Sequence, residues 1–211
     1  MKNVVAMLIL ELACLSFAHA SPITTVFDNL GGANTYDGAI VYAPYYYAVY
    51  ASFTTLDPEF VLDDVKADLL LVGSPTGMLD IALYSDSANA PGSLLESIGT
   101  IDDSSLTATP AIYDFPVSPI TLAPGEYWFG ITSAGSPTDN SDAAWVMTND
   151  LSGGVGSQYY YESWDHTLSN SKIGLALKMD VSGYDAPEPS TILFGAIGLA
   201  MLAAYRRRVA S

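Results

Sequence analysis

The chain has 211 residues, is half hydrophobic and carries a formal net charge of −16 at pH 7. This length accommodates one ordinary domain plus processing segments, but not two full domains. The middle of the chain holds all but two of the 23 acidic residues and only three of the seven basic ones, Lys66, Lys172 and Lys178. Such a chain repels phosphate backbones and has no basic stripe to neutralise them, which excludes nucleic acid as a partner.

Residues 1–20 have the parts of a secretory signal peptide. Lys2 gives a positive start, and an apolar run interrupted by Glu11 continues to Phe17. An Ala-x-Ala exit then precedes a polar residue, so we expect signal peptidase to recognise Ala18, Ala20 and Ser21. The run is too short and too interrupted to be a stable membrane span.

Cys14 is the single cysteine of the chain and allows a second reading of this leader. Leu12-Ala13-Cys14 half-resembles a lipobox, but Glu11 stands where that motif needs an aliphatic residue, so we favour signal-peptidase cleavage. Once the leader is removed, the protein has no thiol for a disulfide, a metal site or a nucleophile.

Residues 21–186 read as short strands separated by turn-forming residues. Leu79, Ile81 and Leu83 alternate with more polar positions, as on a strand with one buried face. This spacing predicts an all-β domain, an antiparallel β-sandwich of jelly-roll-like type. The strands are expected at residues 39–43, 47–54, 65–72, 78–84, 94–101, 111–117, 127–132, 143–148, 158–163 and 173–181.

Glycine and proline residues separate these segments. Gly73-Ser74-Pro75-Thr76-Gly77 stands between two good strand patterns and predicts a hairpin loop. No helical pattern of ten or more residues and no fixed-period repeat occurs in this middle part.

Tyrosine is the most distinctive residue type of the middle, with one cluster at 42–50 and another at 159–164. Exposed rings of this kind can stack on sugars, and the candidate glycan-stacking residues are Tyr46, Tyr50, Tyr160 and Trp164. Packing of half these rings in the core, with the rest at sheet edges, is the simpler interpretation and is favoured.

Calcium is a weaker candidate ligand, and no other cofactor is expected. Two acidic loops are dense in oxygen donors, although neither follows the EF-hand pattern. Solvated turns explain these loops more simply. The candidate ligands are Asp102, Asp103, Asp139 and Asp142.

Catalysis finds little support. His166 is the only histidine outside the leader, no Gly-x-Ser-x-Gly elbow occurs, and no second histidine or cysteine could complete a zinc site. Carboxylate pairs able to cleave a glycoside cannot be nominated among so many acidic residues. We therefore expect no catalytic residue and no enzyme, and a secreted hydrolase is the second alternative.

Residues 187–211 contain three parts in order. Pro187, Glu188 and Pro189 precede an apolar run, expected to be a transmembrane helix over 190–205, and a basic cluster follows at Arg206, Arg207 and Arg208. That helix would be about 24 Å long at ~1.5 Å per residue, shorter than a hydrocarbon core of roughly 30 Å. The arginines would stay cytoplasmic, which leaves the middle of the chain outside. A simple membrane anchor and a transient sorting signal both fit.

This tail resembles the PEP-CTERM sorting tail of Gram-negative bacteria, whose parts are the Pro-Glu-Pro triplet, the short apolar helix and the arginine cluster. The resemblance implies that an exosortase removes the tail near Pro187-Glu188-Pro189 after transient anchoring in the inner membrane. The product would be released or attached at the cell surface, typically in organisms that make exopolysaccharide.

A looser resemblance concerns the domain. Asp28-Asn29-Leu30-Gly31-Gly32, Phe53-Thr54-Thr55 and Leu83-Tyr84-Ser85-Asp86-Ser87, with Pro91-Gly92-Ser93-Leu94-Leu95, resemble choice-of-anchor extracellular domains. That group is defined by sorting context, so it implies fold and location only. The sequence thus predicts a non-enzymatic cell-envelope or extracellular-matrix protein, for example of a biofilm matrix, with an exopolysaccharide-binding module as the first alternative.

Overall fold

The computed structural model describes residues 23–42, 48–56, 60–73, 76–133, 142–153, 156–162, 168–170 and 175–186. The chain divides into two units, residues 23–186 and the two ends taken together. The predicted signal helix and the predicted transmembrane helix belong to the second unit and lie outside the described residues. Within the described ranges, no helix is long and apolar enough to cross a membrane.

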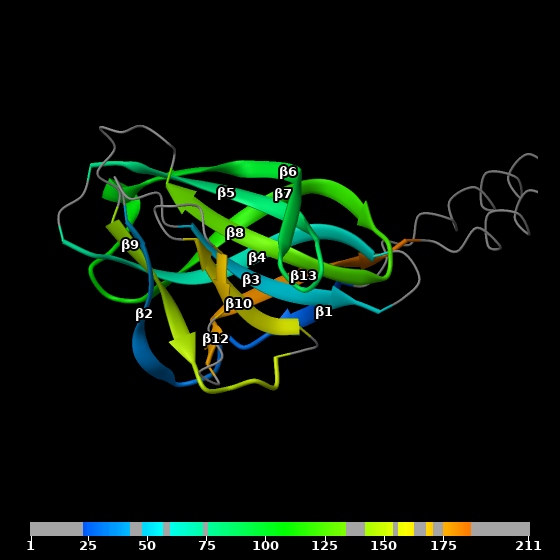
Figure 1. The fold of residues 1–211 in the computed structure, drawn as a ribbon, viewed down its shortest axis with the longest axis horizontal. Coiled ribbons are helices and arrows are strands. Elements are labelled where there is room, and N and C mark those ends of the chain that lie inside the picture. Colours follow the sequence, from blue (N-terminus) through cyan, green and yellow to red (C-terminus); the bar gives the residue numbers. More distant parts are fainter. Residues whose placement is uncertain are drawn as a thin grey trace, which may run out of the picture. The chain divides into compact units, whose positions relative to one another are not determined.

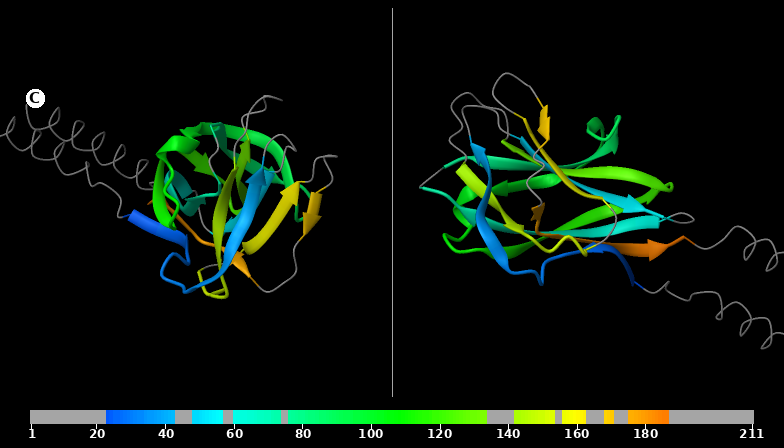
Figure 2. Two further views of the ribbon diagram at one scale, coloured as in Figure 1. Left: turned by 90° about the vertical axis from the view of Figure 1, so that its left-hand side faces the viewer. Right: turned by 60° about the horizontal axis from the view of Figure 1, so that its bottom comes forward.

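Residues 23–186 form two antiparallel sheets that face each other, as Figure 2 shows, so the prediction of an all-β sandwich is confirmed. The jelly-roll type stays a prediction. The strands are β1 (Ile23–Asp28), β2 (Asn34–Tyr42), β3 (Ala48–Thr55), β4 (Phe60–Leu71), β5 (Met78–Asp86), β6 (Pro91–Asp102), β7 (Ala111–Leu122), β8 (Gly125–Ser133), β9 (Asp142–Thr148), β10 (Gly156–Glu162), β11 (Leu168–Asn170), β12 (Ala176–Leu177) and β13 (Met179–Asp185). A single turn of 3-10 helix, Asp103–Ser105, follows β6.

Sheet A has the strand order β1-β13-β4-β9-β12, with β2 paired to β9 and β7 paired to β4. Sheet B has the order β11-β10-β3-β8-β5-β6. The first and last strands of the domain, β1 and β13, are direct neighbours (Figure 1).

The core lies between the sheets because alternate side chains of each strand point inward. Leu79, Ile81 and Leu83 are all fully buried in it, which confirms the face predicted from their spacing. The rings of Phe129 in sheet B and Trp145 in sheet A meet edge to face, with centroids 5.5 Å apart. Burying such large apolar side chains is the main source of stability for a domain without disulfides.

The predicted hairpin around Gly73–Gly77 is wrong. β4 lies in sheet A and β5 in sheet B, so this connection crosses from one sheet to the other. The hairpin forms one step later, between β5 and β6, where Ala88 and Asn89 both have positive φ and Ser87 N–H donates to Ala90 O at 2.8 Å. Glycine-rich loops suit both kinds of connection, so the loop sequence alone does not distinguish them.

Candidate functional site

The outer face of sheet A carries a row of charged side chains. Along β4, Val65, Ala67 and Leu69 point into the core, so the intervening Asp64, Lys66 and Asp68 point outward. The strand register places Asp180 of β13 opposite Lys66 on one side and Asp114 of β7 opposite it on the other.

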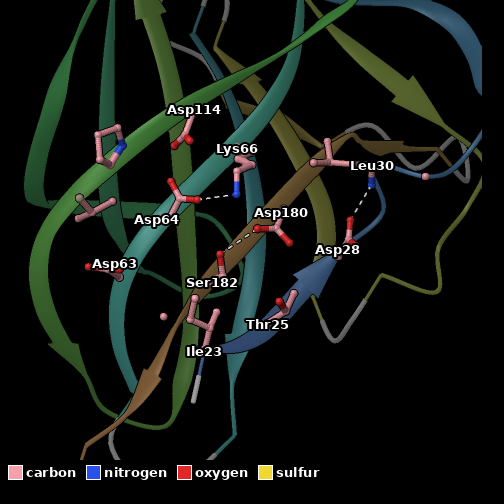
Figure 3. Close-up of a pocket in the computed structure, with 14 residues that line it drawn as sticks. Ile23, Thr25, Asp28, Leu30, Asp63, Asp64, Lys66, Asp114, Asp180 and Ser182 are labelled. Carbon is pink, nitrogen blue, oxygen red and sulfur yellow. Dashed lines mark hydrogen bonds and ion pairs between the residues drawn. The ribbon is translucent and has the colours of Figure 1, made fainter. Parts of the chain in front are cut away.

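A cavity of about 650 Å³ lies over this face, formed by β1, β4, β7 and β13 together with the turn after β1 (Figure 3). It is strongly acidic, with one lysine among its ionisable side chains. These side chains are Asp28, Asp63, Asp64, Lys66, Asp114 and Asp180.

Asp64 is the central group of this cavity. Lys66 Nζ lies 2.7 Å from Asp64 Oδ2. The other oxygen, Oδ1, is buried and has no hydrogen-bond partner of good geometry among the described residues, while the carboxyl of Asp114 is close enough to influence the pKa of Asp64. Burial alone would raise the pKa of Asp64, but the hydrogen bonds with Asp114 and Lys66 and the charge of Lys66 outweigh it and lower this pKa.

The neighbouring carboxyls shift the opposite way. The hydrogen bond to Asp64, with burial and the negative charge of Asp64, raises the pKa of Asp114. Burial raises the pKa of Asp180, although Ser182 Oγ donates to its Oδ1 at 2.9 Å. Two carboxyls in contact disfavour double ionisation, so Asp64 and Asp114 tend to share one proton.

Glycoside hydrolysis needs two carboxyl groups about 5 to 9.5 Å apart around the sugar. Asp64 and Asp114 shift each other's pKa in opposite directions, so they act as a coupled pair and not as two independent groups. Asp64 is also occupied by the ion pair with Lys66. Among the described residues, no three histidine, cysteine or acidic side chains gather in a way that could hold a metal ion.

A second polar cluster on sheet A contains a buried ion pair. Lys178 Nζ lies 3.0 Å from Asp68 Oδ2 and donates to Asn34 Oδ1 at 2.7 Å. The backbone oxygen of Lys178 accepts a hydrogen bond from Trp145 Nε1 at 2.8 Å. The cluster thus connects β2, β4 and β9 around the junction of β12 and β13. We therefore assign it a structural role.

The two tyrosine-rich segments meet in sheet B, where Tyr160 of β10 stands directly opposite Tyr50 of β3. Tyr50 is only 7% exposed and packs edge to face on Tyr84, with ring centroids 5.3 Å apart. Its ring face is therefore not open to a sugar, which corrects its assignment as a stacking residue. Tyr160 is placed by the register alone, and Tyr46 and Trp164 lie outside the described residues.

The calcium candidates are placed in different environments. Asp103 is fully buried and accepts a hydrogen bond from Gly77 N–H at 3.0 Å, so it is a structural residue rather than an open ligand. Asp102 accepts from Ser104 N–H at 2.8 Å and caps the 3-10 turn. Burial and the nearby charge of Asp103 raise the pKa of Asp142, while Asp139 lies outside the described residues.

Sequence reasoning missed the acidic cavity, although a signal was present. The alternation Asp64-Val65-Lys66-Ala67-Asp68 on a central strand, with Asp180-Val181-Ser182 on another, places charge on one face of the sheet. What the sequence does not show is that β4 and β13 are neighbours. His166 and the predicted leader and tail residues, Ala18, Ala20, Ser21, Pro187 to Pro189 and Arg206 to Arg208, lie outside the described residues.

Comparison with protein families decides the nature of the C-terminal segment. The PEP-CTERM protein-sorting motif matches residues 185–209. The chain carries a PEP-CTERM sorting motif. This motif implies an exported protein that passes through a membrane-anchored stage and is processed by an exosortase, which confirms the prediction made from the tail. The resemblance of the domain to choice-of-anchor proteins stays a prediction.

The PEP-CTERM motif begins at Asp185, the last residue of β13, so it directly continues the β-domain. The solved structures similar to that domain include two of one clostridial protein. One is the "crystal structure of the cysteine protease and lectin-like domains of Cwp84, a surface layer associated protein of Clostridium difficile", at 9% identity and a TM-score of 0.50, covering 71% of this chain and 36% of that one.

The other solved structure is the clostridial cysteine protease Cwp84 after propeptide cleavage, at 11% identity and a TM-score of 0.49, covering 70% of this chain and 38% of that one. This chain thus spans little more than a third of the solved chains, and at 9% identity the likeness concerns the fold alone. The comparison with curated proteins finds no matching sequence.

Proposed function

We propose that the exported protein is a non-enzymatic component of the cell envelope or of the extracellular matrix. The observation that carries this proposal is the PEP-CTERM motif placed directly behind an all-β domain. One further feature supports it: the only cysteine, Cys14, stands in the expected leader, so the exported part has no thiol nucleophile.

The sorting part of the proposal is tested by replacing both Pro187 and Pro189 with alanine and fractionating the cells. We expect the variant to keep its tail and to accumulate in the inner membrane. Pro119→Ala, at an exposed position of β7, is the matched control and should be processed normally. Unchanged processing and location of the double variant would contradict sorting through this motif.

The non-enzymatic part is tested on the protein purified from the cell surface. Incubated with exopolysaccharide from the producing cells, it should release no new reducing ends. Release that disappears in Asp64→Asn or Asp114→Asn would instead establish the secreted hydrolase, the alternative that the acidic cavity favours.

Carbohydrate binding is the first alternative. The register that brings the two tyrosine-rich segments together favours it, and one similar solved structure contains lectin-like domains. A glycan array, run with and without calcium, tests this alternative: binding that Tyr160→Ala removes would support it, and no binding to any glycan would eliminate it.

A further inference from the structure

The described domain begins and ends at the same place in sheet A. Ile23, the first residue of β1, pairs with Tyr184 of β13, and Thr24 pairs with Gly183. On its other side the end of β13 is paired with β4, Tyr184 with Val61 and Asp185 with Phe60. The last residues of the domain are therefore held by two strands, one of which is the first strand of the domain.

The sorting motif leaves very little chain between this paired strand end and the Pro-Glu-Pro triplet. Ala186 is the one residue between Asp185 and Pro187. An extended residue spans at most ~3.6 Å, so the Cα atoms of Asp185 and Pro187 are at most about 7 Å apart. An enzyme that binds an extended peptide uses the main-chain groups of several successive residues. The groups just before the triplet are already engaged in the sheet.

We propose that removal of the sorting tail is gated by local opening of the β13 end: residues 183–185 leave β1 and β4 before the exosortase cleaves near Pro187-Glu188-Pro189. The inference rests on the proposed processing of the tail and adds its regulation. The rate of tail removal then depends on the fraction of molecules that are open at a given moment, and so on the stability of this corner of the sheet.

The burial of residues along β13 indicates how far the strand end can open. Met179 and Val181 are fully buried in the core and hold the first part of β13 in place. The register to β4 then shifts between Ser182 and Gly183. Gly183 is still buried, but beyond it Tyr184 is half-buried and Asp185 is exposed. An irregular ladder followed by increasingly exposed residues is a weaker point at which a strand end can separate.

Two opposite changes test this gate in cells that contain the exosortase. The rate of tail removal is measured by pulse-chase labelling, and mass spectrometry identifies the new C-terminus. Inserting six glycine and serine residues between Ala186 and Pro187 gives the enzyme unpaired chain. We expect this insertion to speed tail removal by about tenfold. That factor corresponds to the free energy of one or two net hydrogen bonds, which no longer have to break before cleavage.

The second change links the end of β13 to β1 with a disulfide, which prevents the two strand ends from separating. Ile23→Cys with Tyr184→Cys joins directly opposed residues, whose Cα separation in an antiparallel pair suits a disulfide. No other cysteine remains after leader removal. We expect tail removal to slow at least tenfold at the natural spacing, to recover with reductant, and to be unaffected when the linker is also present. Asp80→Cys with Thr100→Cys, opposed residues of β5 and β6, is the matched control and should change nothing.

Equal rates for the natural, linker and disulfide forms would overturn the gate while leaving sorting intact. A tail that is never removed from any form, the natural one included, would overturn the sorting proposal itself. Slowing by both disulfides alike would also contradict the gate, because it would reflect general stiffening of the domain.

Discussion

Lys178 Nζ lies 3.0 Å from Asp68 Oδ2, and both side chains are only 7% exposed. A second ion pair on the same sheet face, Lys66 with Asp64, is shorter at 2.7 Å but is 35% and 20% exposed. Solvent screens the second pair and not the first, so burial rather than distance decides how much each pair matters. The two pairs therefore allow a matched comparison within one sheet.

Lys178→Met should destabilise the domain strongly, because it leaves the carboxylate of Asp68 buried without its cation. Breaking a buried pair in this way costs about 3 to 5 kcal/mol. Lys66→Met should lower the free energy of unfolding by about 1 kcal/mol or less. Urea denaturation of both variants measures the difference, and equal losses would show that the buried pair has no special role.

Asp114→Asn should change how stability depends on pH. The folded pKa of Asp114 is raised, so its stabilising contribution is complete below the unfolded value of 3.8 and is lost as pH rises through the folded pKa. The pKa of Asp64 is lowered, so its contribution is present above 3.8 and is lost as pH falls through the folded pKa. An asparagine at position 114 keeps a donor to Asp64 at every pH.

The variant should therefore gain stability relative to the natural protein as pH rises above 3.8 and through the raised folded pKa of Asp114. The gain should be small, about 0.5 kcal/mol, because the side chain of Asp114 is exposed to solvent. Denaturation midpoints at several pH values provide the test. Asp63→Asn, an exposed residue that lines the same cavity, is the control. Parallel pH profiles for all three proteins would refute the shared proton.

Gly130→Ala should disturb the aromatic cluster of Tyr50, Tyr84 and Trp128 on the outer face of sheet B. An added Cβ at this position would lie 2.7 Å from atoms of both tyrosine rings, so at least one ring must move. Overpacking of this kind costs about 1 to 3 kcal/mol. Gly99→Ala meets no atom within 4 Å and should change stability by less than about 0.5 kcal/mol. Thermal unfolding and near-ultraviolet circular dichroism distinguish the two outcomes.

Most strands could be predicted from the sequence because their signals are local. The alternation of Leu79, Ile81 and Leu83 depends only on neighbouring residues, and the burial of all three confirms it. β1 and β11 were not predicted. Strand pairing is not local: the segment around Gly73 is equally suited to a hairpin and to a crossing between sheets, and only the packing of the core decides.

The candidate sites likewise differ in whether their signal is local in the sequence. The sorting motif is a contiguous signal and could be read directly from the sequence. The acidic cavity depends on β4, β7 and β13 being neighbours, which joins Asp64, Asp114 and Asp180 across more than a hundred residues. The burial of Tyr50 cannot be predicted from the sequence, because a tyrosine-rich strand does not reveal which of its rings are covered.

The most direct test of the account is the mass of the mature protein at the surface of cells that contain the exosortase. Intact-mass and terminal-peptide analysis should find an N-terminus at Ser21 and a C-terminus at or near Pro187-Glu188-Pro189, with residues 190–211 absent. A surface protein that still ends in Arg206-Arg207-Arg208 and the three residues after it would contradict sorting by tail removal.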